Sequence, residues 1–299
     1  MKVIKLSTVS RTTTLSPLRY PGGKAKLSAF IQRTFEDNAL IGAHYAEPYA
    51  GGAGVGLSLL ALDYVSQIHL NDIDPSVYAF WRSVLNYPEE LCKLVTDTRV
   101  TIHEWRKQKE IQAAPDRHSL IELGFSTLFL NRTNRSGIIR GGGVIGGLHQ
   151  TGPWKLNARY YKSTIKKRIQ WIATQAKRIT LHNLDAETFL LSIANQYEND
   201  RIFIYLDPPY YIKGHRLYEN HYSHEDHARV AGLIQTQLTK SWVVSYDDHS
   251  NVRTFYKKCA AKAYRLQYTA AKRSKGREVM FFSSDLEIPS VSPISLSRV

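Results

Sequence analysis

Short apolar segments recur along the chain and predict buried β-strands. They are rich in Ile, Val, Phe and Tyr, and most run into Gly, Pro, Asn or Asp, residues that commonly end a strand. Stretches long enough for helices separate them; in residues 228–239, for example, apolar side chains repeat at helical spacing. Strands that alternate with helices predict an α/β protein with a mainly parallel sheet covered on both faces. The predicted strands are residues 43–49, 67–71, 178–183, 202–206, 242–246 and 279–283.

The middle of the chain interrupts this alternation. From about residue 77 to 168 the pattern is mostly helical, and residues 120–130 form one clear helical segment. Six glycines then fall between Gly137 and Gly147. A helix does not tolerate that glycine density, whereas a hairpin or a flexible loop does.

These patterns predict one α/β domain that carries an insert. The domain comprises residues 16–78 and 169–285, and the insert comprises residues 79–168. Residues 1–15 are predicted to be flexible. Residues 286–299 are rich in Ser and Pro, which predicts a disordered tail.

Composition places the chain among globular proteins, with 43% hydrophobic and 22% charged residues in 299. No apolar run reaches the roughly 18 residues that span a bilayer, and the first 15 residues lack the apolar core of a secretory signal. The two cysteines, Cys92 and Cys259, fit neither a disulfide framework nor a metal site. His224 and His227 would need a third ligand to hold a metal, so we predict no metal site. A cytoplasmic location follows.

Basic residues are concentrated in two stretches, and the formal net charge is +14. No Asp or Glu occurs from residue 123 to 184, nor from residue 253 to 277. One sign of charge over such lengths favours a polyanionic partner, although either stretch alone is compatible with a solvated basic surface. The first stretch contains Arg132, Arg135, Arg140, Lys155, Arg159, Lys162, Lys166, Lys167, Arg168, Lys177 and Arg178; the second contains Arg253, Lys257, Lys258, Lys262, Arg265, Lys272, Arg273, Lys275 and Arg277.

The predicted strand at residues 202–206 ends on Asp207, which is followed by Pro208, Pro209 and Tyr210. Ligands of open α/β sheets bind beyond the carboxyl ends of the strands, and the two prolines stiffen the backbone there. The Asp207 carboxylate and the Pro208 carbonyl can accept the two N–H bonds of an exocyclic amine while Tyr210 stacks on its base. Such acceptors stabilise a transition state in which the amine nitrogen directs its lone pair at a methyl group.

Asp-Pro-Pro-Tyr is the catalytic motif of amino-group methyltransferases, and residues 17–283 resemble the Dam-type (D12 class) DNA adenine methyltransferases. The order of motifs is that of the family: cofactor segments, then the recognition insert, then the catalytic motif. The resemblance implies a Rossmann-like sheet of the type that binds S-adenosylmethionine, with a helical or hairpin target-recognition insert. It is nearer to phage and mobile-element members than to the housekeeping enzyme that methylates GATC, and it implies a bacterial or phage origin.

Two glycine-containing segments resemble the family's first cofactor motifs. In Pro17-Leu-Arg-Tyr-Pro-Gly-Gly-Lys, the resemblance assigns Tyr20 and Lys24 to the cofactor, with Lys24 pairing with its methionine carboxylate. This turn alone is also typical of a surface loop. In Glu47-Pro-Tyr-Ala-Gly-Gly-Ala-Gly, the resemblance assigns Glu47, Gly51 and Gly54 to a glycine-rich cofactor loop.

Two acidic residues complete the predicted cofactor site. An acid at the end of the second strand, about 20 residues past the glycine loop, is placed to bind a ribose diol. By family match this acid is Asp72 rather than Asp74, although either could cap the next helix. Asp185 matches a position that contacts the cofactor's adenine, and an N-cap role for it stays open.

The insert resembles the family's target-recognition region, in which an Asn-Arg segment and a hairpin enter DNA. Arginine can bond guanine bidentately in the major groove, and other basic side chains bind phosphates. Which residue does which is not readable from the sequence. The candidates are Arg132, Arg135, Arg140, Lys155 and Arg159.

The sequence thus predicts a site-specific DNA adenine methyltransferase that uses S-adenosylmethionine and double-stranded DNA. Methylation of cytosine N4 or of RNA adenine by the same motif is a second hypothesis. A DNA-binding module with a degenerate cofactor site is a third. The residues leave the oligomeric state open, are compatible with a monomer, and leave open a cognate restriction endonuclease as partner.

Overall fold

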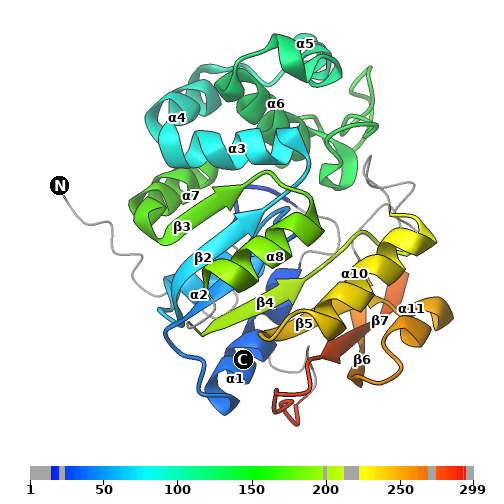
Figure 1. Cartoon of the computed structure of the whole chain (residues 1–299). Helices are drawn as coiled ribbons and strands as arrows, with labels where there is room; N and C mark the ends of the chain where they lie inside the picture. Colours follow the sequence, from blue (N-terminus) through cyan, green and yellow to red (C-terminus); the bar gives the residue numbers. More distant parts are fainter. Residues whose placement is uncertain are drawn as a thin grey trace.

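The computed structural model describes residues 15–19, 24–197, 201–211, 222–268, 274–291 and 293, and its centre is a seven-stranded sheet (Figure 1). The strands are β1 (Ala43–Glu47), β2 (Val65–Asn71), β3 (Ile179–His182), β4 (Ile202–Leu206), β5 (Ser241–Asp247), β6 (Ala260–Tyr268) and β7 (Ser274–Phe282). Their order is β3-β2-β1-β4-β5-β7-β6. Strands β1 to β5 pair in parallel, whereas β7 is antiparallel to β5 and β6. The predicted α/β class with a mainly parallel sheet is confirmed.

Helices cover both faces of the sheet. Because successive side chains of a strand point to opposite faces, β4 contributes to two cores. In β4, Phe203 and Tyr205 join the core beneath α1 (Ser28–Asp37) and α2 (Gly54–Ala61). Ile202, Ile204 and Leu206 point to the other face and join the core of α8 (Ala186–Gln196), α10 (His224–Thr236) and α11 (Ser250–Phe255). Burial on both faces explains why β4 is apolar throughout.

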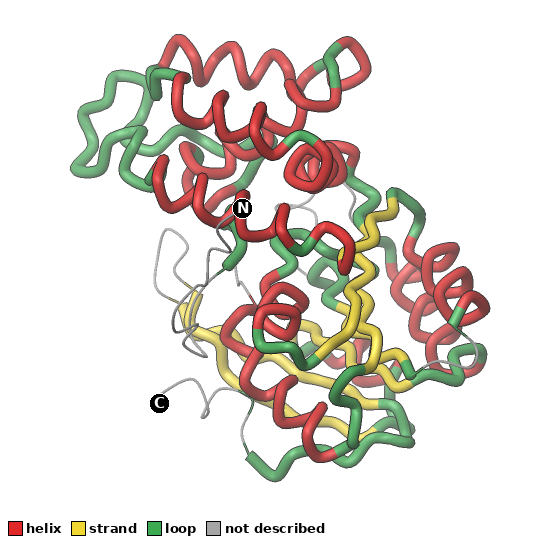
Figure 2. The backbone as a smooth tube through the Cα atoms, turned by 90° about the vertical axis from the view of Figure 1, so that its left-hand side faces the viewer, coloured by secondary structure: helices red, strands yellow, loops and turns green. Residues whose placement is uncertain are grey.

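The insert lies between β2 and β3 and consists of helices that gather at one end of the sheet (Figure 2). Asp74 caps the first of them through the Ser76 N–H, and Ser119 and Glu122 form a capping box on another. Both predicted insert boundaries, at residues 79 and 168, fall inside helices. The helices are α3 (Pro75–Asn86), α4 (Pro88–Asp97), α5 (Ile102–Ala113), α6 (Leu120–Thr133) and α7 (Lys162–Thr174), with 3-10 turns η2 (Pro115–Arg117), η3 (Arg135–Gly137) and η4 (Ala176–Arg178).

The glycine-rich segment of the insert forms turns. Between α6 and α7, a stretch described throughout, no strand forms, and a single antiparallel bridge joins Asn134 to Val144. Gly137 has a φ of +78°, and a Cβ there would lie 2.4 Å from the Arg19 carbonyl oxygen. Glycine is therefore required at this position by both backbone conformation and space.

The prediction of a disordered tail is wrong for its first residues. Leu286, Ile288 and Val291 pack against the core. Asn38 donates to the Glu287 carbonyl at 2.8 Å and accepts from the Glu287 N–H at 2.7 Å. Polar composition suggested disorder, but these three apolar side chains anchor the segment. The predicted flexible segment, residues 1–15, lies outside the described residues except for Leu15, which is buried.

Candidate active site

Asp207 follows β4 at the carboxyl edge of the sheet, where β4 lies beside β1. From β1 the strand order runs one way through β2 and β3 and the other way through β4 and β5. Crevices at such a reversal are the usual ligand sites of open α/β sheets. The two loops that leave β1 and β4 both begin at this reversal, and they contain the predicted cofactor loop and the predicted catalytic motif.

The Asp207 carboxylate is held by one of its oxygens. Its Oδ1 accepts a hydrogen bond from Ser245 Oγ at 3.1 Å and lies 3.2 Å from Lys24 Nζ. Among the described residues, no partner bonds Oδ2. The side chain is 29% exposed, so one oxygen is anchored while the other is available to a substrate donor. Ser245 lies on β5, the strand next to β4.

Tyr210 is buried, and its hydroxyl is tethered. It donates to Glu278 Oε1 at 3.0 Å, and Lys24 Nζ lies 5.5 Å from the centroid of its ring. Of the two prolines between Asp207 and Tyr210, Pro208 is buried and Pro209 is half-buried. Hydrogen bonds therefore hold the side chains at both ends of the motif, Asp207 through Oδ1 and Tyr210 through its hydroxyl.

Glu278 is a member of this cluster that sequence analysis missed. It lies on β7 with no exposed surface, and it accepts hydrogen bonds from Lys24 Nζ at 2.7 Å and Tyr264 Oη at 2.6 Å as well as from Tyr210. One signal could have found it: Glu278 is the first acid after a long basic stretch and directly precedes the apolar residues 279–283 that were predicted as a strand.

The Lys24 ammonium group lies between the half-buried carboxylate of Asp207 and the fully buried carboxylate of Glu278. Burial alone would lower the pKa of Lys24, but Asp207 and Glu278 raise that pKa above its usual value. Burial raises the pKa of Asp207; Lys24 opposes this and Glu278 adds to it. Lys24 is therefore charged, and Asp207 is a stronger acceptor than an exposed aspartate.

Glu47, assigned to the cofactor by resemblance, points into the protein at the end of β1. It accepts bonds from Tyr45 Oη at 2.7 Å and from the Gly56 N–H at 3.0 Å. Burial raises the pKa of Glu47 to about 7. Glu47 therefore holds the start of α2. A Cβ at Gly56 would lie 3.0 Å from the Tyr45 ring, so a larger residue there would crowd this contact.

The glycine loop and Asp72 are joined directly. Asp72 Oδ2 accepts the Gly51 N–H at 2.9 Å, and its Oδ1 accepts the Asp74 N–H at 3.0 Å. Gly51 has a φ of +43°, and Gly54 begins α2. Burial raises the pKa of Asp72 to about 7. Asp74 is the helix cap, which leaves Asp72 as the acid of the loop.

Asp185 is exposed and caps α8, accepting the Glu187 N–H at 2.9 Å. Its loop lies against the one that contains Asp72. Asn71 donates to the Leu184 carbonyl at 3.0 Å and accepts from the Leu184 N–H at 2.9 Å. The structure therefore brings Asp72 and Asp185 onto neighbouring loops. Tyr20, predicted to contact the cofactor, lies outside the described residues.

The sequence matches the model of the D12 class N6 adenine-specific DNA methyltransferase family over residues 20–273. The chain belongs to this family. Family membership makes it an adenine-specific DNA methyltransferase, and the resemblance carried by the Asp207 motif is confirmed.

Two solved structures of the rRNA methyltransferase aviRa from Streptomyces viridochromogenes resemble this methyltransferase weakly. They are 15% and 14% identical to it, with TM-scores of 0.39 and 0.40. The matches cover 95% and 94% of this chain and 94% of each aviRa chain. No curated protein sequence matches the chain.

The basic residues of the methyltransferase's insert divide into interior and surface groups. Arg132 is buried, and its Nε donates to the Pro17 carbonyl at 2.7 Å. Burial lowers the pKa of Arg132 to about 9. Arg140 is half-buried and donates to Ser76 Oγ at 2.8 Å. These contacts hold the fold, and a DNA contact by Arg132 or Arg140 stays a prediction.

The remaining three candidates are exposed. Arg135 follows α6, and Lys155 and Arg159 lie in the turns that precede α7. The Arg159 guanidinium lies 5.8 Å from the ring centroid of Trp154, which is 65% exposed. A large exposed aromatic beside basic side chains is an arrangement suited to nucleic acid.

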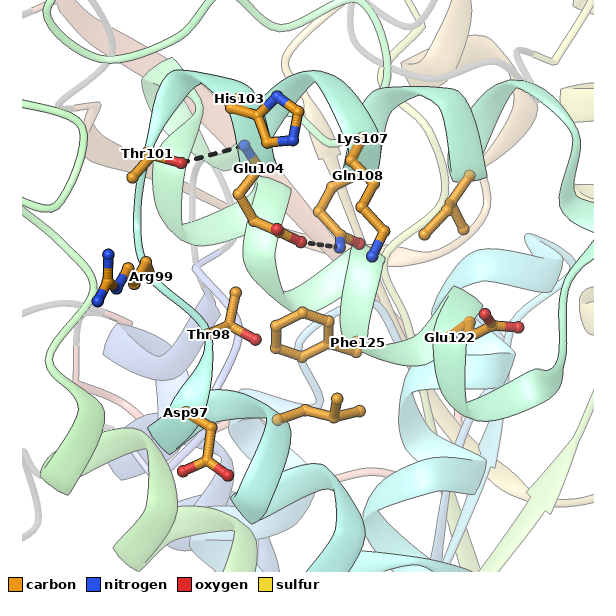
Figure 3. A pocket seen from close by; sticks show the side chains of 12 residues that line it. Asp97, Thr98, Arg99, Thr101, His103, Glu104, Lys107, Gln108, Glu122 and Phe125 are labelled. Atoms are coloured by element: carbon orange, nitrogen blue, oxygen red, sulfur yellow. Dashed lines mark hydrogen bonds between the residues drawn. The ribbon is translucent and has the colours of Figure 1, made fainter.

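A cavity of about 690 Å³ lies elsewhere in the insert, among α4, α5 and α6 (Figure 3). Phe125 and Ile111 line it together with charged side chains of both signs, including Arg99 and Glu104. None of its lining residues belongs to the cluster around Asp207.

Cys92 and Cys259 are both free thiols. Within the described ranges, no group of His, Cys, Asp and Glu side chains could hold a metal ion. In the same part of the methyltransferase, no helix has the length and apolar character needed to cross a membrane.

Proposed function

We propose that this methyltransferase transfers a methyl group from S-adenosylmethionine to the N6 amino group of an adenine that has flipped out of double-stranded DNA. One observation carries the proposal: Asp207 lies at the strand-order reversal with Oδ1 anchored by Ser245 and Lys24 and with Oδ2 directed to no described residue.

The described residues fit the methyl donor. Asp72, half-buried at the end of β2, offers a carboxylate of the kind that accepts bonds from ribose hydroxyls. Gly51 has no side chain that would hinder a ligand from approaching the backbone, and Asp185 lies on the adjoining loop. Lys24 has the charge to pair with the methionine carboxylate, although its contacts in the structure are with Asp207 and Glu278. The donor supplies an electrophilic methyl group.

The chain's own residues activate the adenine. Asp207 Oδ2 accepts one N6–H and the Pro208 carbonyl accepts the other, while the Tyr210 ring stacks on the base. These acceptors favour a tetrahedral nitrogen, whose lone pair forms the new N–C bond as the C–S bond breaks. The surplus N6 proton passes afterwards to Asp207 Oδ2, which already accepts that N–H, and from there to solvent, so Asp207 need not remove it before attack.

The DNA is bound by the exposed basic residues of the insert. Arg135, Lys155 and Arg159 contact phosphates or base edges, and flipping the adenine costs about a few kcal/mol, which these contacts offset. Arg140 contributes only if its bond to Ser76 opens.

The test is methylation by the purified protein with radiolabelled S-adenosylmethionine and varied unmethylated DNA, followed by nucleoside analysis. N6-methyladenine is expected from the wild type. Asp207→Asn should remove it without changing thermal stability appreciably, and the exposed Asp116→Asn is the matched control.

Label in cytosine, or label in RNA but not in DNA when both are offered, would overturn the proposal in favour of the related methylation reactions. No label combined with no cofactor binding by calorimetry would instead indicate a DNA-binding module.

A further inference from the structure

We propose that Glu278 is a positioning residue for methyl transfer: it fixes the Tyr210 ring and shares Lys24 with Asp207, so that it controls both groups that receive the adenine. The inference rests on the proposed function, since it assigns a role within the same site.

The geometry links three segments of the chain through one carboxylate. Lys24 comes from the turn before α1, Tyr210 from the loop after β4, and Tyr264 from β6. All three donate to Glu278, which is fully buried. Burying a carboxylate is costly unless it is paired and hydrogen-bonded. The three donors meet that requirement, and two of them lie beside the reacting atoms.

The first consequence concerns Tyr210. A tyrosine ring whose hydroxyl is free can tilt about its side-chain torsions, whereas the bond to Glu278 Oε1 at 3.0 Å fixes both ends of the side chain. A fixed ring face presents the flipped base to Asp207 in one orientation. Misplacement of reacting groups by about an ångström costs on the order of 100-fold in rate.

The second consequence concerns the charge on Asp207. Lys24 lies 2.7 Å from Glu278 and 3.2 Å from Asp207, so the ammonium is nearer to Glu278. Without the Glu278 charge, Lys24 would be attracted to Asp207 alone. Asp207 would then be a weaker acceptor for the N6–H, because its negative charge would be more fully compensated. Glu278 thus maintains Asp207 as an acceptor.

Two substitutions separate these effects. Glu278→Gln keeps an oxygen within reach of Tyr210 but removes the charge, whereas Tyr210→Phe keeps the ring and the charge but removes the tether. Both are measured as single-turnover methylation rates against pH, on DNA that the wild type methylates.

For Glu278→Gln we expect a rate lower by about tenfold or more. The acid limb of its pH profile should move to lower pH, because loss of the neighbouring negative charge lowers the pKa of Asp207. For Tyr210→Phe we expect a lower rate with the acid limb unmoved. Asp248→Asn is the matched control. It removes a carboxylate that is 7% exposed and is paired with Arg253 and Arg277, so the substitution should alter stability and leave the pH profile of the methylation rate unchanged.

A Glu278→Gln enzyme with wild-type rate and wild-type pH profile would overturn the assignment. If Glu278→Gln does not fold, Tyr210→Phe still tests whether Glu278 positions the ring. An undiminished methylation rate in Tyr210→Phe would show that the hydrogen bond from Tyr210 to Glu278 is not needed. Failure of the wild type to methylate DNA would count against the proposed function and is distinguishable from either result.

Discussion

Asn131 and Arg19 hydrogen-bond reciprocally across the molecule. The Asn131 amide donates to the Arg19 carbonyl at 2.8 Å and accepts from the Arg19 N–H at 2.7 Å. Asn131 is buried at the end of α6, and it also donates to the Gly137 carbonyl at 2.8 Å. One side chain of the insert therefore holds the segment that leads to Lys24, which joins the recognition region to the catalytic cluster.

Substituting Asn131 with Ala should loosen this junction. Three hydrogen bonds are lost and buried backbone groups are left unsatisfied, so the free energy of unfolding should fall by about 2–4 kcal/mol. Affinity for S-adenosylmethionine should weaken as well, because Lys24 follows the released segment. Urea denaturation and calorimetry measure the two effects. Asn157→Ala, an exposed position in the same insert, is the control, and equal behaviour of the two variants would contradict the role of Asn131.

Arg135 and Arg132 should respond differently to replacement by Gln, although only two residues separate them. Arg135 is exposed, so its loss should weaken DNA binding and reduce the slope of log K against log salt by about 1. Arg132 bonds the Pro17 carbonyl from the interior, so its loss should lower the melting temperature and leave that slope unchanged. DNA-binding titrations at several salt concentrations distinguish the two. A slope reduced equally in both variants would show that Arg132 reaches DNA.

Cofactor affinity should depend on pH through Asp72. Its pKa is raised to about 7 by burial, and an ionised carboxylate is the form that accepts bonds from ribose hydroxyls. Affinity should therefore fall about tenfold as the pH drops from 8 to 6. The Asp72→Asn variant should bind the cofactor more weakly, and its affinity should depend less on pH. Any pH dependence that remains is attributable to Glu47, whose pKa is also raised to about 7. A wild-type affinity that is flat over this range would rule the mechanism out.

His69 should make the fold sensitive to acid. His69 is fully buried, and its Nε2 atom lies 3.0 Å from Nδ1 of His44. Burial lowers the pKa of His69 to about 3. The folded state favours the neutral ring. The contribution of His69 to the free energy of unfolding is therefore complete above the pKa of histidine in the unfolded chain, near 6.5, and is lost as the pH falls below it. Between pH 7 and 5 the loss should be about 2 kcal/mol.

The measurement is urea unfolding of the wild type and of His69→Gln at both pH values. Other titrating groups are common to the two proteins and cancel in the difference. The exposed His149→Gln serves as control and should lose stability with pH as the wild type does. A difference near zero between the wild type and His69→Gln would mean that His69 accepts a proton without cost.

Strand β4 was predictable because it is an uninterrupted apolar run that ends at Asp207. The edge strand β6 was not, since it pairs on one side only and alternates apolar residues with Lys262 and Arg265 within a basic stretch. An edge strand exposed to solvent has no continuous apolar run to detect. The glycine-rich segment of the insert left a hairpin and a flexible loop equally open, because glycine density indicates an absence of helix but does not select among the alternatives.

The candidate site was predictable where its chemistry is local. The motif from Asp207 to Tyr210, the acid at Asp72 and the glycine loop are each contiguous in sequence. The partners that position them are not: Ser245 reaches Asp207 from the next strand, and Glu278 reaches Lys24 from 254 residues away. Such pairings depend on strand order, which residue patterns do not specify. For the same reason, Arg132 could not be recognised as an interior residue from a count of basic side chains.

The pairing of Lys24 with Glu278 also has a consequence for the order of folding. Closing a loop of 254 residues costs about 5 kcal/mol in chain entropy, more than one ion pair supplies. The contact therefore cannot initiate folding, and it forms only after parallel pairing and the β6–β7 pair have brought β7 to the sheet. A partly folded chain would lack the carboxylate that shares Lys24 with Asp207, so catalytic competence should be among the last properties that the protein acquires as it folds.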